Sequence, residues 1–218
     1  METIERRATP RGELVLRRDE QTGRYEIISN GVFLMDTSDG RSERLLVSAA
    51  LAAAAEPRRL LIGGLGVGFS LAQAVADDRL AAITVLEREP AVVAWQREYL
   101  TRFSDNAVTD PRVEVVVDDL VRWLRTDAPP AGYDAICLDI DNGPHWTVVP
   151  GNAELYDTAG LLAVRAALAP GGALAVWSAA AVPAFERRLA DVFGPVTTHP
   201  VEVSRGEPDV VYVTRRAT

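Results

Sequence analysis

Apolar and polar positions follow two different patterns along this chain. Between residues 13 and 36, short extended runs are separated by turn residues, among them the pair Asn30-Gly31. Asn-Gly between apolar runs is a strong hairpin signal, because both residues accept a positive φ. This part is therefore predicted to form a small β-hairpin or meander. Residues 42–55 then have helical spacing, and Pro57 lies just beyond them.

From residue 58 onward, segments typical of strands alternate with segments typical of helices. Near-continuous apolar runs, such as 113–117 and 135–138, suit a parallel sheet covered on both faces. The pattern predicts an α/β fold with a doubly wound, mostly parallel, Rossmann-like sheet. The segments 196–205 and 209–216 are expected to finish this sheet as a hairpin.

Two parts are expected: an N-terminal β-hairpin region at 1–47, and a Rossmann-like nucleoside-binding catalytic domain at 48–218. A hairpin alone is not stable in water. We therefore expect the first part to pack against the second part or against another subunit.

Composition narrows the classes of ligand, partner and location that are expected. The formal net charge of −8 disfavours nucleic acid as a partner and mildly favours a small cationic ligand. No apolar run approaches the roughly 20 residues that span a bilayer, and the first residues lack the pattern of a secretory signal, so no membrane partner and a cytoplasmic location are expected. Cys137 lies within an apolar run, which favours packing over redox or zinc chemistry, and no metal is expected.

Residues that could bind a ligand or take part in a reaction lie just after the predicted strands. In such sheets, ligands bind beyond the carboxyl ends of the strands. Gly63, Gly64, Gly66 and Gly68 stand between a strand and a helix. Without β-carbons, such a loop turns tightly and approaches a ligand closely, beside free N–H groups of the following helix. The other interpretation is close packing alone, since the spacing differs from the dinucleotide motif.

Acidic residues end the next three predicted strands. Glu87 follows the glycines by about 20 residues, which suits hydrogen bonds from both hydroxyls of a ribose. Asp118 and Asp119 suit either the exocyclic amine of adenine or the cap of the next helix. Asp139 and Asp141 are two residues apart, so in an extended strand end both would face one cavity and favour a cationic or amine-bearing ligand.

These motifs together resemble the class I S-adenosylmethionine-dependent methyltransferase fold and, within it, the spermidine synthase (polyamine aminopropyltransferase) family. The matching stretches are NGVFLM, IGGLGVGFSL, VLERE, DDLVRWL, YDAICLDIDNGP, LYDTAGL and LAPGGALAVWS.

The resemblance implies roles for individual residues. Gly64, Gly66 and Gly68 would line the donor, which is S-adenosylmethionine or its decarboxylated form. Glu87 would hold the ribose, and Asp119 with Leu120 would meet the adenine. Asp139 would position and deprotonate the attacking amine, with Asp141 nearby. It also makes a homodimer plausible, formed through the N-terminal region.

Departures from the family pattern fall mainly in the acceptor half. Val67 occupies an aspartate position of the glycine loop, and the second family acid aligns with Asn142. The family's Tyr-His-Glu stretch aligns with residues 42–44, and Leu34 or Met35 replaces a glutamine.

Three functions are consistent with this sequence. The first is aminopropyl transfer to an amine through an atypical acceptor site that includes Asn142. The second is methyl transfer from S-adenosylmethionine to a small acceptor, with His145 as a base and Trp146 as a stacking wall. The alternative for that pair is a loop histidine beside an aromatic lid. The third is a non-catalytic nucleoside-binding module.

Overall fold

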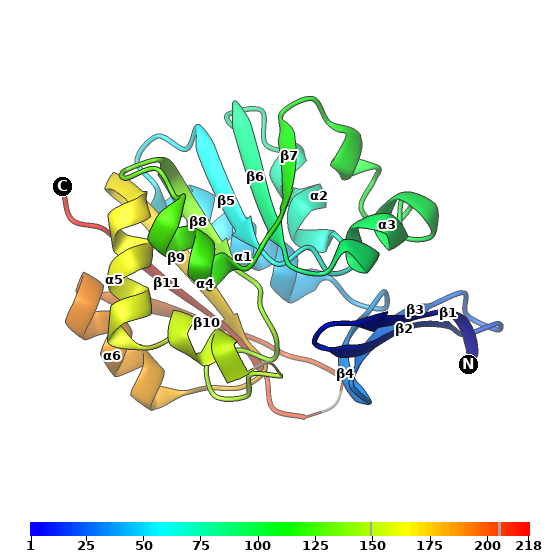
Figure 1. Ribbon diagram of the computed structural model, residues 1–218. Helices are drawn as coiled ribbons and strands as arrows, with labels where there is room; N and C mark the ends of the chain where they lie inside the picture. Colours follow the sequence, from blue (N-terminus) through cyan, green and yellow to red (C-terminus); the bar gives the residue numbers. More distant parts are fainter. Residues whose placement is uncertain (149, 205) are drawn as a thin grey trace.

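The computed structural model describes residues 1–148, 150–204 and 206–218. Its N-terminal part is a four-stranded antiparallel sheet in the order β1-β2-β3-β4 (Figure 1). The strands are β1 (Glu2–Thr9), β2 (Gly12–Arg18), β3 (Tyr25–Ser29) and β4 (Val32–Asp36). Asn30 and Gly31 join β3 to β4 with φ of 50° and 79°, as the Asn-Gly signal predicts. The strand β1 was not predicted, because its side chains are mostly polar.

The larger sheet has seven strands in the order β10-β11-β9-β8-β5-β6-β7. They are β5 (Arg59–Gly63), β6 (Ala82–Glu87), β7 (Val113–Val117), β8 (Tyr133–Leu138), β9 (Leu168–Ser178), β10 (Val196–Val201) and β11 (Asp209–Arg215). The strands β5 to β9 pair in parallel, and β11 is antiparallel to both β9 and β10. The predicted doubly wound sheet and its closing hairpin are confirmed; of the expected segment 196–205, Arg205 lies outside the described residues.

Helices cover both faces of this sheet. They are α1 (Arg41–Ala53), α2 (Phe69–Val75), α3 (Pro90–Glu98), α4 (Leu120–Thr126), α5 (Thr158–Ala167) and α6 (Pro183–Phe193), with 3-10 turns η1 (Ala107–Thr109) and η2 (Pro150–Leu155). The first three helices contribute to one apolar core and the last three to another, on the opposite face. Cys137 is fully buried in the first core, as its apolar run predicts.

The N-terminal sheet packs against the first core through Leu14, Leu16 and neighbouring apolar residues. Polar contacts add to this packing: Trp95 Nε1 donates to Glu5 Oε2 at 2.6 Å, and Arg102 donates to the Gly23 carbonyl at 2.8 Å. The expected boundary after residue 47 falls inside α1, and α1 packs against β9 and β11. The whole helix therefore goes with the larger sheet. No helix in the described part of the chain has the length and apolarity to cross a membrane.

Candidate active site

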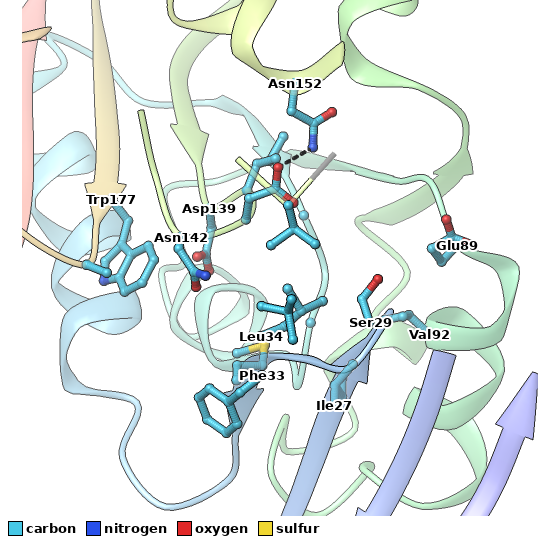
Figure 2. A pocket seen from close by; sticks show the side chains of 18 of the residues that line it. Ile27, Ser29, Phe33, Leu34, Glu89, Val92, Asp139, Asn142, Asn152 and Trp177 are labelled. Atoms are coloured by element: carbon cyan, nitrogen blue, oxygen red, sulfur yellow. Dashed lines mark hydrogen bonds between the residues drawn. The ribbon is translucent and has the colours of Figure 1, made fainter. Parts of the chain in front are cut away.

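A cavity of about 530 Å³ lies between the N-terminal sheet and one edge of the larger sheet (Figure 2). Its lining comes from β2 to β4, from the start of α1, and from the residues that follow β5, β6, β7 and β8. Parallel strands all end at this edge, and their loops leave a crevice where the chain crosses to opposite faces. The volume is within the range of sites that enclose nucleotide-sized ligands.

The glycine loop forms one wall of the cavity. Gly64 and Gly66 line it with φ of 94° and 48°. A β-carbon at Gly64 would collide with the carbonyl oxygen of Asp139, so only glycine fits there. Gly68, at the N-cap of α2, instead packs against Ser104 and Gln96 and is not among the cavity residues. The contact of Gly68 with a donor stays a prediction.

Glu87 is the last residue of β6, and its carboxylate forms a hydrogen bond with the backbone of the glycine loop. One carboxylate oxygen, Oε2, accepts from the Leu65 N–H at 3.0 Å, and Oε1 accepts from the Glu89 N–H at 2.8 Å. Burial raises the pKa of Glu87, while these backbone hydrogen bonds act in the opposite direction. Each oxygen keeps a further lone pair. Because Glu87 also lines the cavity, it is placed to accept hydrogen bonds from a ligand's hydroxyl groups.

Asp119 combines the two roles that its position predicts. It caps α4, accepting from the Arg122 N–H at 3.1 Å, and it lines the cavity beside the buried Leu120. Its Oδ2 lies 3.4 Å from a guanidinium nitrogen of Arg88. An adenine-sized ligand in this part of the cavity would therefore meet one carboxylate and one apolar side chain.

Asp139 follows β8 and faces the cavity (Figure 2). Its Oδ2 accepts from the Ser70 hydroxyl at 2.9 Å. Burial, together with the negative charge of Asp209 and against the effect of the Ser70 hydrogen bond, raises the pKa of Asp139 to about 6. A carboxylate of this kind accepts a proton readily near neutral pH.

Asp141 also lines the cavity, but the geometry expected for it is wrong. The strand ends at Leu138, and Asp141 has φ of 53°, which is not extended backbone. Its Oδ2 accepts from Asn152 Nδ2 at 2.8 Å. Asp209 and Glu43 are two carboxylates that interact electrostatically with Asp139.

Glu43 and Asp209 are site residues that the sequence reasoning missed. Glu43 is in the first turn of α1, only 8% exposed, and burial together with the charge of Asp139 raises its pKa to about 8. Burial also raises the pKa of Asp209, at the start of β11. The Ser42 hydroxyl lies 2.8 Å from Asp209 Oδ2 and 3.1 Å from Glu43 Oε2. Glu43 was missed because an acid in the first turn of a helix usually faces solvent. Asp209 was missed because only the antiparallel pairing of β11 with β9 brings it to this end of the cavity.

Negative side chains dominate the cavity lining. The carboxylates are Glu13, Asp36, Asp39, Glu43, Glu87, Glu89, Asp118, Asp119, Asp139, Asp141 and Asp209. Among the described residues, the basic side chains in the lining are those of Arg11 and Arg88. Both are already paired: Arg11 Nε lies 2.8 Å from Glu89, and Arg88 approaches Asp119. The cavity therefore favours a cationic ligand.

Comparison with known proteins agrees with this geometry. The family model described as spermine/spermidine synthase domain matches residues 41–188. The chain belongs to the spermine/spermidine synthase domain family.

Individual members of the family show how far the likeness extends. A polyamine aminopropyltransferase of Mycobacterium tuberculosis is 34% identical over 120 residues, which are 55% of this chain and 22% of that protein. Polyamine aminopropyltransferase 2 of Pseudomonas aeruginosa is 31% identical over 159 residues, 70% of this chain and 42% of that protein. The chain thus spans less than half the length of these two relatives.

The fold is that of solved spermidine synthases. A crystal structure of spermidine synthase in complex with the transition state analogue AdoDATO matches 99% of this chain and 74% of its own, with a TM-score of 0.84 and 17% identity. The spermidine synthase from Thermotoga maritima matches 99% of this chain and 73% of its own, with a TM-score of 0.81 and 17% identity.

Within this spermine/spermidine synthase domain, the contacts of Val67 explain why the glycine loop has an apolar residue at this position. Val67 is fully buried, and its N–H donates to the sulfur of Met35 at 3.2 Å. The same sulfur covers Gly66, where a β-carbon would collide with it. The loop position at which an aspartate was expected is thus a buried valine in contact with a methionine of β4.

The three residues expected at the acceptor end differ in placement. Asn142 is 7% exposed, lines the cavity and lies beside Asp139 in Figure 2. Trp146 also lines the cavity, although it is 54% exposed. His145 is exposed and is not among the cavity residues, so the structure gives no support for it as a base or a binding residue. Trp177, near the end of β9, also lines the cavity and lies near Asn142 in Figure 2.

Proposed function

We propose that this protein transfers an aminopropyl group from decarboxylated S-adenosylmethionine to an amine acceptor. The observation that carries the proposal is the group formed by Glu43, Asp139 and Asp209, three carboxylates that line the cavity and accept hydrogen bonds from the hydroxyl groups of Ser42 and Ser70. Buried carboxylates repel one another unless a cation or a proton lies between them. A protonated amine satisfies that requirement. The family and the names of its relatives support the same choice.

The opposite end of the cavity suits the nucleoside of the donor. Gly64 and Gly66 allow close approach of the backbone, Glu87 offers lone pairs to the ribose hydroxyls, and Asp119 with Leu120 offers the adenine an acceptor and an apolar contact. The proposed order of contacts therefore runs from adenine at α4 to sulfonium near the glycine loop.

The charges of the lining favour the decarboxylated donor. The carboxylate of S-adenosylmethionine itself would need a cationic or N–H partner, but Arg11 and Arg88 are engaged by Glu89 and Asp119. Near Asp139, an added carboxylate would also meet a field of the same sign. An aminopropyl tail is cationic and meets the opposite sign.

The reaction requires alignment and one proton acceptor. The lone pair of the acceptor amine attacks the terminal carbon of the propyl group that is bonded to sulfur. The carbon–sulfur bond breaks, its electron pair stays on sulfur, and methylthioadenosine leaves. Asp139 takes the proton that the amine nitrogen loses. Because the sulfonium is already a good leaving group, holding the two reactants in line supplies much of the acceleration.

The acceptor site is proposed to be atypical. Leu34 or Met35 stands where the family has a glutamine, and both residues line the cavity with Trp177 and Phe33. This apolar wall leaves less hydrogen bonding along the acceptor than the family pattern provides. Asn142, Asp141 and Trp146 complete the proposed acceptor end. The homodimer and the cytoplasmic location stay predictions, and light scattering tests the first of them.

One experiment separates the candidate functions. The protein is titrated calorimetrically with S-adenosylmethionine, its decarboxylated form and methylthioadenosine, and amine mixtures incubated with each donor are analysed by mass spectrometry. A product heavier by an aminopropyl unit supports the proposal. A product heavier by a methyl group replaces it with methyl transfer, and tight binding without any product indicates a non-catalytic nucleoside-binding module.

Asp139→Asn tests the proposed base directly. The amide cannot accept the amine proton, so we expect turnover to fall on the order of 10²-fold or more while the affinity for methylthioadenosine stays nearly unchanged. Equal loss of both quantities would remove Asp139 from this role.

A further inference from the structure

Two exposed aromatic side chains belong to the lining of the cavity. In the described part of the chain, the strongly exposed large apolar side chains are those of Met1, Phe33, Val117, Trp146 and Leu162. Of these, Phe33 and Trp146 line the cavity, although they are 49% and 54% exposed. An aromatic ring has a large apolar area to bury, so contact with an apolar part of a ligand stabilises it.

An irregularity in β4 directs three successive side chains to the cavity. Side chains of a regular strand alternate between its two faces. Along β4, Met35 pairs with Ile27, and the next pair is Phe33 with Ile28. Leu34 is thus an extra residue between the two pairs, as in a β-bulge. Phe33, Leu34 and Met35 all line the cavity, so this wall is continuously apolar where a regular strand would alternate.

Trp177 brings apolar surface next to the carboxylates. Val211 of β11 pairs with Trp177 of β9. Asp209 comes two residues before Val211, so its side chain extends from the sheet face that carries Trp177. Trp177 and Asp209 both line the cavity. In Figure 2, Phe33 and Trp177 lie on the same side of the view as Asp139.

The carboxylates at this end need only one ammonium group. Burial and the charge of Asp139 raise the pKa of Glu43 to about 8, so Glu43 holds a proton at neutral pH. A protonated Glu43 can donate to the Ser42 oxygen, 3.1 Å away, while the Ser42 hydroxyl donates to Asp209 at 2.8 Å. This chain of hydrogen bonds involves both carboxyl groups without a ligand. Asp139 then remains to meet the amine.

Arginines already neutralise other acids of the lining. Arg24 Nη1 lies 3.3 Å from Asp36 Oδ2, and Arg11 Nε lies 2.8 Å from Glu89 Oε1. The many carboxylates of the lining therefore do not by themselves require a ligand with several positive charges.

We propose that the acceptor is an arylalkylamine, a primary amine with one ammonium group and an aromatic ring at its other end. The inference rests on the proposed function, in which Asp139 faces the attacking amine. The ring lies against the apolar wall of Phe33, Leu34, Met35 and Trp177, with Trp146 as a further aromatic contact.

The chemistry of transfer is the same for such an acceptor. Its ammonium group gives one proton to Asp139, and the nitrogen then attacks the propyl carbon bonded to sulfur. The carbon–sulfur bond breaks, and its electron pair stays on sulfur. The products are methylthioadenosine and a secondary ammonium ion that carries the aminopropyl group.

The test compares an aromatic monoamine with an aliphatic diamine. The value of kcat/KM for transfer from decarboxylated S-adenosylmethionine is measured with phenethylamine and with butane-1,4-diamine, for the wild type, Phe33→Ser and Leu162→Ser. Leu162, on α5, is the matched control: it is 49% exposed, like Phe33, but is not among the cavity residues. Each variant replaces a half-exposed apolar side chain with serine.

We expect the wild type to use phenethylamine more efficiently than the diamine on the order of tenfold or more, because the ring buries apolar area that the diamine lacks. Phe33→Ser should lower kcat/KM for phenethylamine on the order of fivefold through KM, with a smaller change for the diamine. Leu162→Ser should leave both values within about twofold of the wild type. The proposal is overturned if the wild type uses the diamine as well as phenethylamine or better. It is also overturned if Phe33→Ser leaves the ratio of the two values unchanged.

A binding measurement separates failure of this inference from failure of the proposed function. Each protein, saturated with methylthioadenosine, is titrated calorimetrically with both amines. If the wild type transfers an aminopropyl group to no amine, the proposed function is wrong. The preference of this site for an apolar amine still stands if the wild type binds phenethylamine more tightly than the diamine and Phe33→Ser removes that difference. Equal or weaker binding of phenethylamine by the wild type refutes it.

Discussion

The replacement Asp139→Asn is expected to stabilise the fold at alkaline pH while it removes the proposed base. In the folded protein, burial and the neighbouring charge of Asp209 raise the pKa of Asp139 from 3.8 to about 6. The folded state therefore holds this proton more tightly than the unfolded state does. Its contribution to stability is present below about pH 4 and is lost as the pH rises through about 6.

The size of the effect follows from that shift. A shift of about two pKa units corresponds to roughly 3 kcal/mol, and this is an upper value because the carboxyl groups of Asp139, Glu43 and Asp209 titrate together. Asparagine has no charge to desolvate, and its Oδ1 still accepts from Ser70. At pH 8 we expect the variant's free energy of unfolding to exceed that of the wild type by about 1 to 3 kcal/mol. At pH 4 the difference should be small.

Urea unfolding followed by circular dichroism at pH 4, 6 and 8 measures this difference. Asp36→Asn is the matched control with the opposite expected sign, because Asp36 pairs with Arg24 and accepts from the Ser38 N–H at 2.7 Å. Its variant should be no more stable than the wild type at pH 8. The reasoning is refuted if Asp139→Asn is less stable than the wild type at pH 8, or if its advantage does not grow between pH 4 and pH 8.

Three further substitutions test the scaffold of the site. In Glu87→Gln, the amide NH₂ group would face a backbone N–H that now donates to the carboxylate. The affinity for methylthioadenosine, measured by calorimetry, should therefore fall at least tenfold. An unchanged affinity would exclude Glu87 from the nucleoside site. Gly64→Ala meets the carbonyl of Asp139 and a positive φ, so thermal unfolding should show a loss of about 2 kcal/mol or more, and a smaller loss would contradict the close contact. Trp95→Phe loses the hydrogen bond to Glu5, so limited proteolysis should cut the N-terminal strand faster; an unchanged rate would show that packing alone holds it.

Much of the scaffold follows from local patterns that need no knowledge of the fold. The Asn30-Gly31 turn, the proline at the start of α3 and the apolar strands β5 and β8 are specified by backbone preferences and by burial on both faces. The glycine loop and Glu87 were found for the same reason, since each lies directly after a recognisable strand. Such signals depend on residues close together in the chain.

The acceptor end depends on contacts between distant parts of the chain. The charge of Asp209, 70 positions later, raises the pKa of Asp139, and the Ser42 hydroxyl donates to Asp209 across 167 positions. Asp141 lies close to Asp139 in sequence, yet the turn after Leu138 directs it toward Asn152 instead. Adjacency in the sequence therefore did not reveal that Asp209 and Glu43 lie near Asp139.

The sequence by itself determined the alternation of strands and helices, the sheet edge at which the cavity lies, and the residues proposed for the nucleoside end, because each is set by short-range pattern. Only the tertiary structure decided which carboxylates share one desolvated space. An acid in a helix's first turn and an acid at the start of a strand look solvated in sequence. They become a pair when α1 and β11 pack side by side, because burial and mutual repulsion exist only in the assembled core.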